Sequence, residues 1–226
     1  MSNLAIIPAR SGSKELKDKN IKLLNGKPLL AYTIEAAKQS NIYSHILVST
    51  DSENYGKIAI QYGAEVPFYR SKENALDTAS SWDVVKETLR KYKDMGIEFD
   101  TFTLLQPTSP LRNFEDIQNA YQLFIEKNAT AVVSVCEMEH SPLWSNTLPE
   151  NNLLLDFLKN DTNTQRQKLK TFYRINGAIY MADVKEFLKD TNLYRDNCYA
   201  YKMPIERSID IDTELDFKIA EIIINQ

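Results

Sequence analysis

The chain has 226 residues, of which 43% are apolar and 26% are charged, and its formal net charge is −4. This length fits one large domain or a core with a modest insertion, and the apolar content can bury a core, which excludes the disordered and fibrous classes. The slightly acidic balance argues against a nucleic-acid-binding or membrane-binding protein, so an anionic ligand would need a local cluster of positive groups.

The cysteines and the first residues indicate the compartment. Cys136 and Cys198 have neither CxxC nor Cys/His spacing, so we expect no disulfide scaffold and no zinc site, only two buried free thiols in a reducing environment. The chain starts without a basic and apolar leader pattern, and no window approaches the roughly 20 apolar residues of a membrane span. We therefore expect a soluble, cytoplasmic protein.

Predicted strands and helices alternate along the chain. Short apolar runs predict strands, and apolar residues at helical spacing with start and stop signals predict helices. In chain order we expect strand 4–9, helix 28–37, strand 45–50, helix 53–62, strand 65–69, helix 81–95, strand 101–106, helix 114–127, strand 130–136, strand 177–182, helix 184–189, strand 199–203 and a helix from 213. This alternation favours an α/β fold with a mostly parallel central sheet and helices on both faces, where ligands bind at the carboxyl ends of the strands.

The alternation stops between residues 138 and 174. Ser141-Pro142, Leu148-Pro149 and the Asn-rich stretch 160–164 offer turns without an α/β period. We interpret 138–174 as an insertion in a single domain that spans 1–226, because no linker is long enough to separate two domains.

A basic loop follows the first predicted strand. Residues 10–22 contain five basic and two acidic side chains, a local charge of +3. The turn Gly12-Ser13-Lys14 can direct backbone N–H groups at phosphate oxygens while Arg and Lys side chains supply charge, although charge alone also fits a solvated surface loop. The patterns GxxxxGK[ST] and GxGxxG are absent, which argues against P-loop ATPases and hydride-transfer dehydrogenases.

An acidic segment precedes the last helix. In an extended chain, Asp210 and Asp212 point to one face while Ile209 and Ile211 pack on the other. Two carboxylates on one face repel each other unless a cation lies between them, and ligation by oxygen alone favours magnesium or manganese. The alternative is that Asp212 only caps the helix and Asp210 is solvated.

Two other segments carry polar groups near predicted strand ends. Gln106 follows a buried strand in a turn stiffened by two prolines, where its amide can meet a hydroxyl or a carboxylate. Arg166 and Arg174 can clamp a carboxylate through two parallel hydrogen bonds. A pair of exposed arginines explains the second segment equally well.

Together these segments resemble the CMP-N-acylneuraminate (CMP-sialic acid) synthetases, cytidylyltransferases that activate nonulosonic acids. Several motifs in family order and spacing, over nearly the whole chain, carry the resemblance: Ile7 to Lys14 with Lys19-Asn20, Val48 to Asp51, Asp77 to Ser81, Gln106 to Arg112, Asn176 to Tyr180, and Ile209 to Asp212. The resemblance implies a Rossmann-like fold of the nucleotidyltransferase type. It also implies CTP and a nine-carbon sugar acid as substrates, with a CMP-sugar and pyrophosphate as products.

The resemblance assigns roles to individual residues. It implies that the catalytic residues are Arg10, Lys14, Lys19, Asp210 and Asp212, with Mg²⁺, or alternatively Mn²⁺, on the two aspartates. The nucleotide-binding residues it implies are Ala9, Arg10, Ser13, Lys14, Lys19, Asn20, Arg70, Ala79 and Ser81. The sugar-binding residues it implies are Gln106, Arg166, Arg174, Asn176 and Tyr180. It further implies a homodimer in which the inserted arm, 138–174, reaches over the partner's active site.

Two residues depart from the family pattern. Glu15 stands where the family usually has Gly, next to the expected triphosphate. Trp144 stands where members specific for sialic acid often carry Lys, which leaves legionaminate and pseudaminate open as substrates beside N-acylneuraminate. A related enzyme for 3-deoxy-manno-octulosonate and a nucleotide-sugar-binding module without activity are further alternatives, although the Lys19-Asn20 pair and the retained Asp210 and Asp212 argue against them.

Overall fold

A six-stranded sheet forms the centre of the computed structural model, which describes residues 1–13, 16–155, 157–158 and 170–225. Its strands are β1 (Asn3–Pro8), β4 (His45–Ser49), β5 (Thr101–Leu104), β6 (Ala131–Glu137), β7 (Tyr173–Asp183) and β8 (Cys198–Lys202). They lie in the order β4-β1-β5-β7-β6-β8. The pairs β1–β4, β1–β5 and β6–β8 are parallel, and β7 is antiparallel to β5 and β6. The predicted mostly parallel sheet is confirmed.

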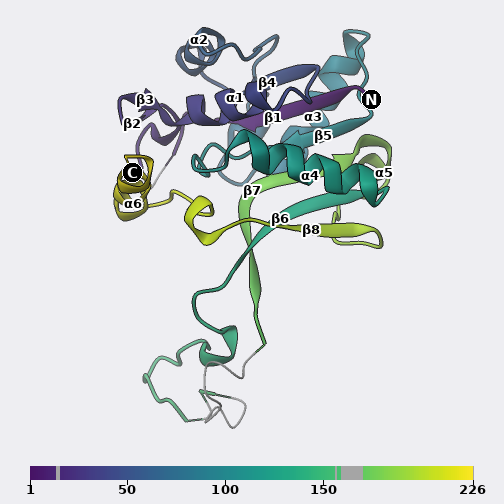
Figure 1. Cartoon of the computed structure of the whole chain (residues 1–226). Coiled ribbons are helices and arrows are strands. Elements are labelled where there is room, and N and C mark those ends of the chain that lie inside the picture. The colour runs from purple at the N-terminus through teal and green to yellow at the C-terminus, as the bar shows by residue number, and fades with distance from the viewer. Residues whose placement is uncertain (14–15, 156, 159–169, 226) are drawn as a thin grey trace.

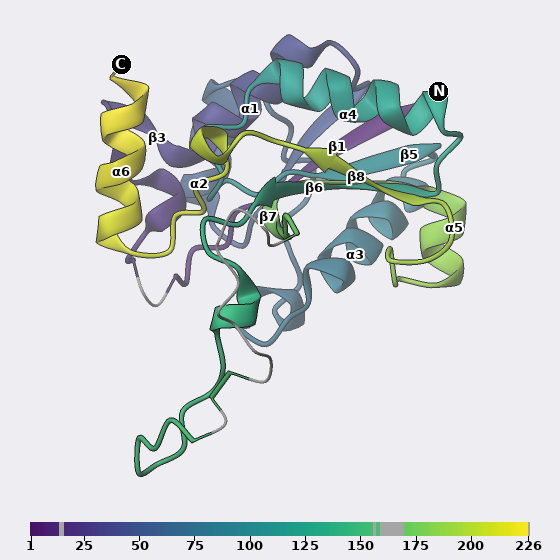
Figure 2. The same cartoon turned by 60° about the horizontal axis from the view of Figure 1, so that its bottom comes forward.

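Helices cover both faces of this sheet. These helices are α1 (Leu29–Ser40), α2 (Glu53–Gln61), α3 (Ser81–Asp94), α4 (Phe114–Glu126) and α5 (Val184–Lys189), whereas α6 (Glu214–Ile224) packs beside the sheet against Leu24 and Leu29. Figure 2 shows α1 and α4 on one face and α3 and α5 on the other. Successive residues of β1 point to opposite faces, so Ala5 and Ile7 pack under α1 and α4 while Leu4 and Ile6 pack toward α3 and α5. A strand covered on both faces explains the unbroken apolar run at 4–9.

One predicted strand is wrong and others have different limits. Residues 65–69 form only a single bridge, from Glu65 to Leu47, because Pro67 has no N–H group with which to continue a ladder. The strand predicted at 101–106 ends at Leu104, and the one predicted at 177–182 is longer, starting at Tyr173. The structure also contains a small hairpin that was not among the predicted elements, formed by β2 (Leu23–Leu24) and β3 (Lys27–Pro28). An Asn-Gly turn with positive φ at both residues, Asn25 and Gly26, connects these strands and was the available signal.

The chain between β6 and β7 leaves the body of the protein. Figure 1 shows the described residues of this stretch, 138–155, 157–158 and 170–172, projecting from the sheet, and we call them the arm; their only regular element is a short 3-10 helix, Pro142–Trp144. Leu148, Leu153, Leu154 and Leu155 are all more than half exposed there. The insertion predicted at 138–174 includes this arm, but its last two residues, Tyr173 and Arg174, belong to β7. In the part of the chain that the structure describes, no helix combines the length and the apolar character needed to cross a membrane.

Candidate active site

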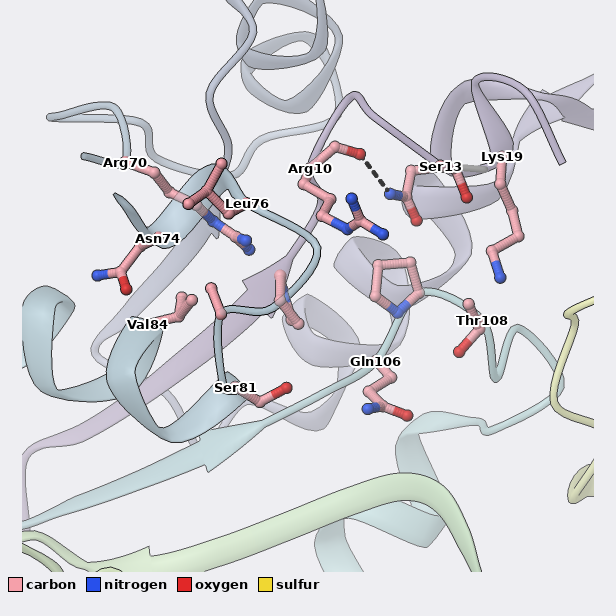
Figure 3. Close-up of a pocket in the computed structure, with 14 residues that line it drawn as sticks. Arg10, Ser13, Lys19, Arg70, Asn74, Leu76, Ser81, Val84, Gln106 and Thr108 are labelled. Atoms are coloured by element: carbon pink, nitrogen blue, oxygen red, sulfur yellow. Dashed lines mark hydrogen bonds between the residues drawn. The ribbon is translucent and has the colours of Figure 1, made fainter. Parts of the chain in front are cut away.

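A polar cavity of about 210 Å³ opens at the carboxyl ends of β1 and β5. Ligands of parallel sheets bind at this edge, next to the strand at which the strand order reverses. Here that strand is β1, which lies between β4 and β5. Figure 3 shows the side chains that surround it. Eight of the predicted site residues line the cavity: Arg10, Ser13, Lys19, Asn20, Arg70, Ala79, Ser81 and Gln106.

The loop after β1 forms one wall and is held by polar contacts. Both the backbone N–H and the hydroxyl of Ser11 donate to the Asp51 carboxylate, each at 2.8 Å, which ties the loop to the end of β4. The Asn20 side-chain amide donates to the Arg10 carbonyl at 3.1 Å. The Arg10 guanidinium forms an ion pair with Asp77 from the opposite wall. The predicted phosphate-binding arginine is therefore paired with a carboxylate in this structure.

Lys19 lies between this loop and the acidic segment. It belongs to a 3-10 helix, Lys19–Ile21, and is only 9% exposed. Its ammonium group donates to the Ile211 carbonyl at 2.8 Å and to the Asp212 carboxylate at 2.9 Å. An ammonium group has three donors, so Lys19 can bind a phosphate oxygen in the cavity while it keeps these two contacts.

Arg70 lines the far wall, and Glu87 lies behind it and holds the neighbouring turn. The Arg70 Nε donates to the Ser49 hydroxyl at 2.8 Å, and burial lowers the pKa of its guanidinium to about 10. Its Nη2 atom is buried and has no hydrogen-bond partner among the described residues. A buried donor without a partner at a cavity wall is well suited to a polar ligand. Glu87 accepts from the Ser71 N–H at 2.9 Å and from the Asn74 amide at 2.6 Å, which fixes the turn that carries Asn74 to the cavity.

Asp210 and Asp212 both lie at this end of the sheet, but their surroundings differ. Burial raises the pKa of Asp210, a hydrogen bond with the Thr108 side chain lowers it, and the neighbouring Asp212 raises it further. Within the described residues, the Oδ1 atom of Asp210 is buried and accepts no hydrogen bond. Asp212 is 59% exposed and is paired with Lys19.

These surroundings fit a divalent cation. The buried, unpartnered oxygen of Asp210 is the kind of ligand that Mg²⁺ uses, and its neighbour Asp212 supplies a second carboxylate. In the described part of the chain, no group of three or more His, Cys, Asp and Glu side chains is arranged to hold a metal. The site therefore fits a cation held by one or two carboxylates together with substrate phosphates, the usual arrangement for Mg²⁺.

Gln106 is positioned by a glycine and by a buried arginine. Gly177 has φ +77°, and a Cβ atom placed there would lie 2.6 Å from the Gln106 Oε1 atom. The Gln106 side chain therefore packs directly over the backbone of β7. Beneath it, the Arg112 Nη1 donates to the carbonyls of Gln106 at 3.3 Å and Ala178 at 3.2 Å, and Arg112 is 1% exposed.

A second, aromatic cavity adjoins the first and shares Ser81 and Gln106 with it. It is also lined by Trp82, Tyr180 and Tyr194, and Trp82 packs edge-on against Tyr180 with 5.7 Å between the ring centroids. Burial raises the pKa of Tyr180 to about 12, with smaller contributions from Tyr194 and Asp210. Tyr180 was predicted at the site. Trp82 and Tyr194 were missed, because no motif or spacing distinguishes them from ordinary core or surface aromatics.

The remaining predicted residues have other positions. Lys14 and Arg166 lie outside the described residues. Ala9 is fully buried and its N–H donates to the Ser49 carbonyl at 2.8 Å, so it anchors the loop through its backbone. Arg174 is exposed, and its guanidinium donates to the Ser208 carbonyl at 3.2 Å.

Asn176 lies in the interior behind the cavity. It is 1% exposed, and its side chain accepts from the Ser134 hydroxyl at 2.6 Å and donates to the Ser208 hydroxyl at 2.9 Å. The pairing register between β6 and β7 shifts between Val133 and Val135. The hydrogen bond from Ser134 to Asn176 joins the two strands at this shift. We therefore assign Asn176 to the support of Gly177 and Tyr180 rather than to direct contact with a sugar.

Comparisons with known proteins show which family this chain is similar to. Residues 4–223 match the model of a family described as cytidylyltransferase. The chain is 40% identical over 223 residues to a CMP-N,N'-diacetyllegionaminic acid synthase of Legionella pneumophila, covering 98% of this chain and 95% of that protein. It is 41% identical over 223 residues to an N-acylneuraminate cytidylyltransferase of Escherichia coli O18:K1:H7, covering 96% of this chain but 51% of that protein. The chain thus spans about half the length of the second relative.

A solved structure supports the fold. A CMP:2-keto-3-deoxy-manno-octonic acid synthetase, complexed with CTP, superposes with a TM-score of 0.74 at 17% sequence identity, covering 100% of this chain and 99% of the other. At this identity the likeness concerns the fold, and it confirms the expected Rossmann-like architecture.

Proposed function

The chain belongs to the cytidylyltransferase family, and from this premise we propose that it transfers CMP from CTP to a nonulosonic acid, giving a CMP-sugar and pyrophosphate. One observation carries the proposal: a single cavity collects the basic side chains Arg10, Lys19 and Arg70 close to the buried, unpartnered oxygen of Asp210. Positive groups for a triphosphate and a carboxylate for a cation are what nucleotidyl transfer requires.

The chemistry follows from the positions of these groups. The anomeric hydroxyl of the sugar acid attacks the α-phosphorus of CTP in line, and the P–O bond to pyrophosphate breaks as the new P–O bond forms. Arg10 and Lys19 bind phosphate oxygens and offset the negative charge that develops on them. The hydroxyl proton leaves to solvent or to a basic group, and no nucleophile from the protein is needed.

Asp210, with Asp212, would hold Mg²⁺, and Mn²⁺ would serve in its place. When bound, the cation supplies charge neutralisation at the phosphates. The Lys19 contact with Asp212 keeps the basic loop and the acidic segment next to each other, so that both act on the same phosphates.

We place the sugar acid in the adjoining aromatic cavity, next to Gln106, which lines both cavities. The Gln106 amide can meet a hydroxyl or carboxylate of the sugar, while Trp82, Tyr180 and Tyr194 offer an apolar surface for an N-acyl group. N-acylneuraminate is our first candidate, with legionaminate and pseudaminate as alternatives. The two relatives described above are named for different sugars at 40% and 41% identity, so identity does not choose between them.

We also propose a cytoplasmic homodimer. The arm carries four leucines that are more than half exposed, and a second copy of the chain would cover them. Trp144 lies on this arm, whereas the cavity lies at the sheet. In the proposed dimer the arm reaches over the active site of the partner subunit, so Trp144 would contact the sugar acid bound there.

A pyrophosphate-release assay tests the proposed function. Four nucleoside triphosphates are each combined with N-acetylneuraminate, legionaminate, pseudaminate or 3-deoxy-manno-octulosonate, with and without Mg²⁺. We expect release that depends on Mg²⁺, CTP and one nonulosonic acid. If no sugar acid gives release, the chain is a binding module, and if only the octulosonate does, the sugar assignment is wrong.

A further inference from the structure

The segment between β8 and α6, which carries Asp210 and Asp212, is joined to the rest of the protein through Arg207. This arginine is the last residue of a 3-10 helix, Ile205–Arg207, three positions before Asp210. Its Nε and Nη2 atoms donate to the two carboxylate oxygens of Asp116, each at 2.8 Å. This is the bidentate arrangement, which fixes the direction of approach as well as the distance.

Asp116 is itself rigidly held. It is completely buried in the first turn of α4 and forms a capping box with Asn113, whose N–H donates to it at 3.2 Å. The Tyr201 hydroxyl of β8 donates to the same carboxylate at 3.2 Å. With the two bonds from Arg207, the carboxylate accepts four hydrogen bonds, which fills its acceptor capacity. The hydrogen bonds to Asp116 raise the pKa of Arg207, so the guanidinium stays charged.

The same two stretches of chain meet again at the cavity. The Ile211 N–H donates to the Thr108 carbonyl at 2.8 Å, and the Thr108 side chain is hydrogen-bonded to Asp210. Thr108 also lines the nucleotide cavity (Figure 3). The turn 106–112 leads directly into α4, so contacts at Thr108 and at Asp116 hold the acidic segment at two points along one continuous piece of chain.

On the basis of the function proposed above, we propose that Arg207 and Asp116 are positioning residues that hold the acidic segment in register with the turn 106–112, so that the Asp210 carboxylate faces the bound cation. Neither residue needs to touch substrate. The Asp116 carboxylate is completely buried, whereas the Arg207 side chain is 36% exposed. Burying that carboxylate costs desolvation energy that an apolar side chain would avoid, so bulk stability alone does not explain the presence of the pair. A contact that orients a metal ligand does explain it, because partners behind metal ligands commonly change metal affinity when they are replaced.

Mn²⁺ binding tests this proposal without relying on turnover. Free Mn²⁺ is measured by electron paramagnetic resonance while the full chain, saturated with CTP and without sugar acid, is titrated with Mn²⁺, for the native protein, Arg207→Gln and Arg207→Lys. A titration of CTP without protein gives the Mn²⁺ that CTP binds by itself. Lysine keeps the charge but cannot make the bidentate contact. We expect about 10- to 100-fold weaker Mn²⁺ binding in both variants, with the larger loss in Arg207→Gln. Arg90→Gln, an exposed arginine on α3, is the matched control and should bind Mn²⁺ like the native protein.

The outcomes separate this inference from the proposed function. Circular dichroism is recorded for every variant, and Arg207→Lys decides if Arg207→Gln does not fold. A folded Arg207→Lys with native Mn²⁺ affinity and native Mg²⁺ dependence overturns the positioning role, even if the protein is an active cytidylyltransferase. Absence of pyrophosphate release from the native protein with every sugar acid overturns the proposed function instead. Weaker Mn²⁺ binding by Arg207→Lys, with native folding, supports the positioning role.

Discussion

The Arg10 guanidinium and the Asp77 carboxylate pair with each other at the polar cavity, joining the loop after β1 to the loop before α3. Arg10 also donates to the Gly12 carbonyl at 2.8 Å, so its side chain lies along its own loop. A triphosphate that binds Arg10 has to share it with Asp77 or displace Asp77. In the proposed function, the carboxylate would therefore compete with the substrate for the same guanidinium.

Removing this competition should tighten nucleotide binding. Both side chains are about one-third exposed, and pairs of this kind contribute up to about 1 kcal/mol, so we expect Asp77→Asn to bind CTP up to about fivefold more tightly. Isothermal titration with CTP in the absence of sugar acid measures this. Asp83→Asn, an exposed aspartate on α3, is the control. Weaker CTP binding by Asp77→Asn would show that Asp77 orients Arg10 instead of competing for it.

Replacing Asp210 should abolish turnover and leave the fold intact. The Asp210→Asn variant keeps the size of the side chain but loses the charge that we assign to cation binding, so we expect at least about a 100-fold loss of kcat. Pyrophosphate release measures activity and circular dichroism measures folding, with the exposed Asp94→Asn as control. Near-normal pyrophosphate release by Asp210→Asn would rule out the metal assignment.

The pKa of Asp210 gives a second prediction for the same variant. Burial raises this pKa in the folded protein, so the folded state holds the proton more tightly than the unfolded state does. Stability therefore falls as the pH rises from the ordinary value of 3.8 through the raised value. At neutral pH without metal, Asp210→Asn should melt at the same or a higher temperature than the native protein. Mg²⁺ should raise the Tm of the native protein but not that of the variant.

The sequence predicted most of the fold and much of the site, for physical reasons that specific residues illustrate. Ser52 and Gly63 mark the ends of α2 because capping and positive φ are local requirements, which the sequence displays. The loop with Arg10 was recognised because its charges are close together in sequence. The Arg10–Asp77 and Arg207–Asp116 pairs could not be predicted, because each joins stretches of chain far apart in sequence whose meeting depends on the topology of the sheet.

The arm should mediate dimer formation through its exposed leucines. Leu154 and Leu155 are 61% and 76% exposed, and a charge at these positions would be buried without a partner in the proposed dimer. We expect the native chain to be a dimer and Leu154→Asp with Leu155→Asp to be a monomer in light scattering. Ile60→Asp, on α2, should remain a dimer. A monomeric native chain would contradict the proposal.

Substituting Gly177 should impair use of the sugar acid more than use of CTP. A Cβ atom at this position would lie 2.6 Å from the Gln106 Oε1 atom, so the flexible end of the Gln106 side chain must move away. Displacing a group that binds substrate by about 1 Å can cost up to roughly 100-fold, and we expect Gly177→Ala to raise the KM for the sugar acid roughly 10- to 100-fold. The KM for CTP should change less.

Backbone strain in this variant needs its own control. Alanine at φ +77° costs about 1–2 kcal/mol of stability wherever it occurs. Gly96 has φ +79° and, among the described residues, no atom within 4 Å of the point that a Cβ atom would occupy, so Gly96→Ala reproduces the strain without the contact. Both variants should lose similar stability in urea denaturation, but only Gly177→Ala should lose affinity for the sugar acid. Equal KM values in the two variants would show that Gln106 does not bind the sugar from this position.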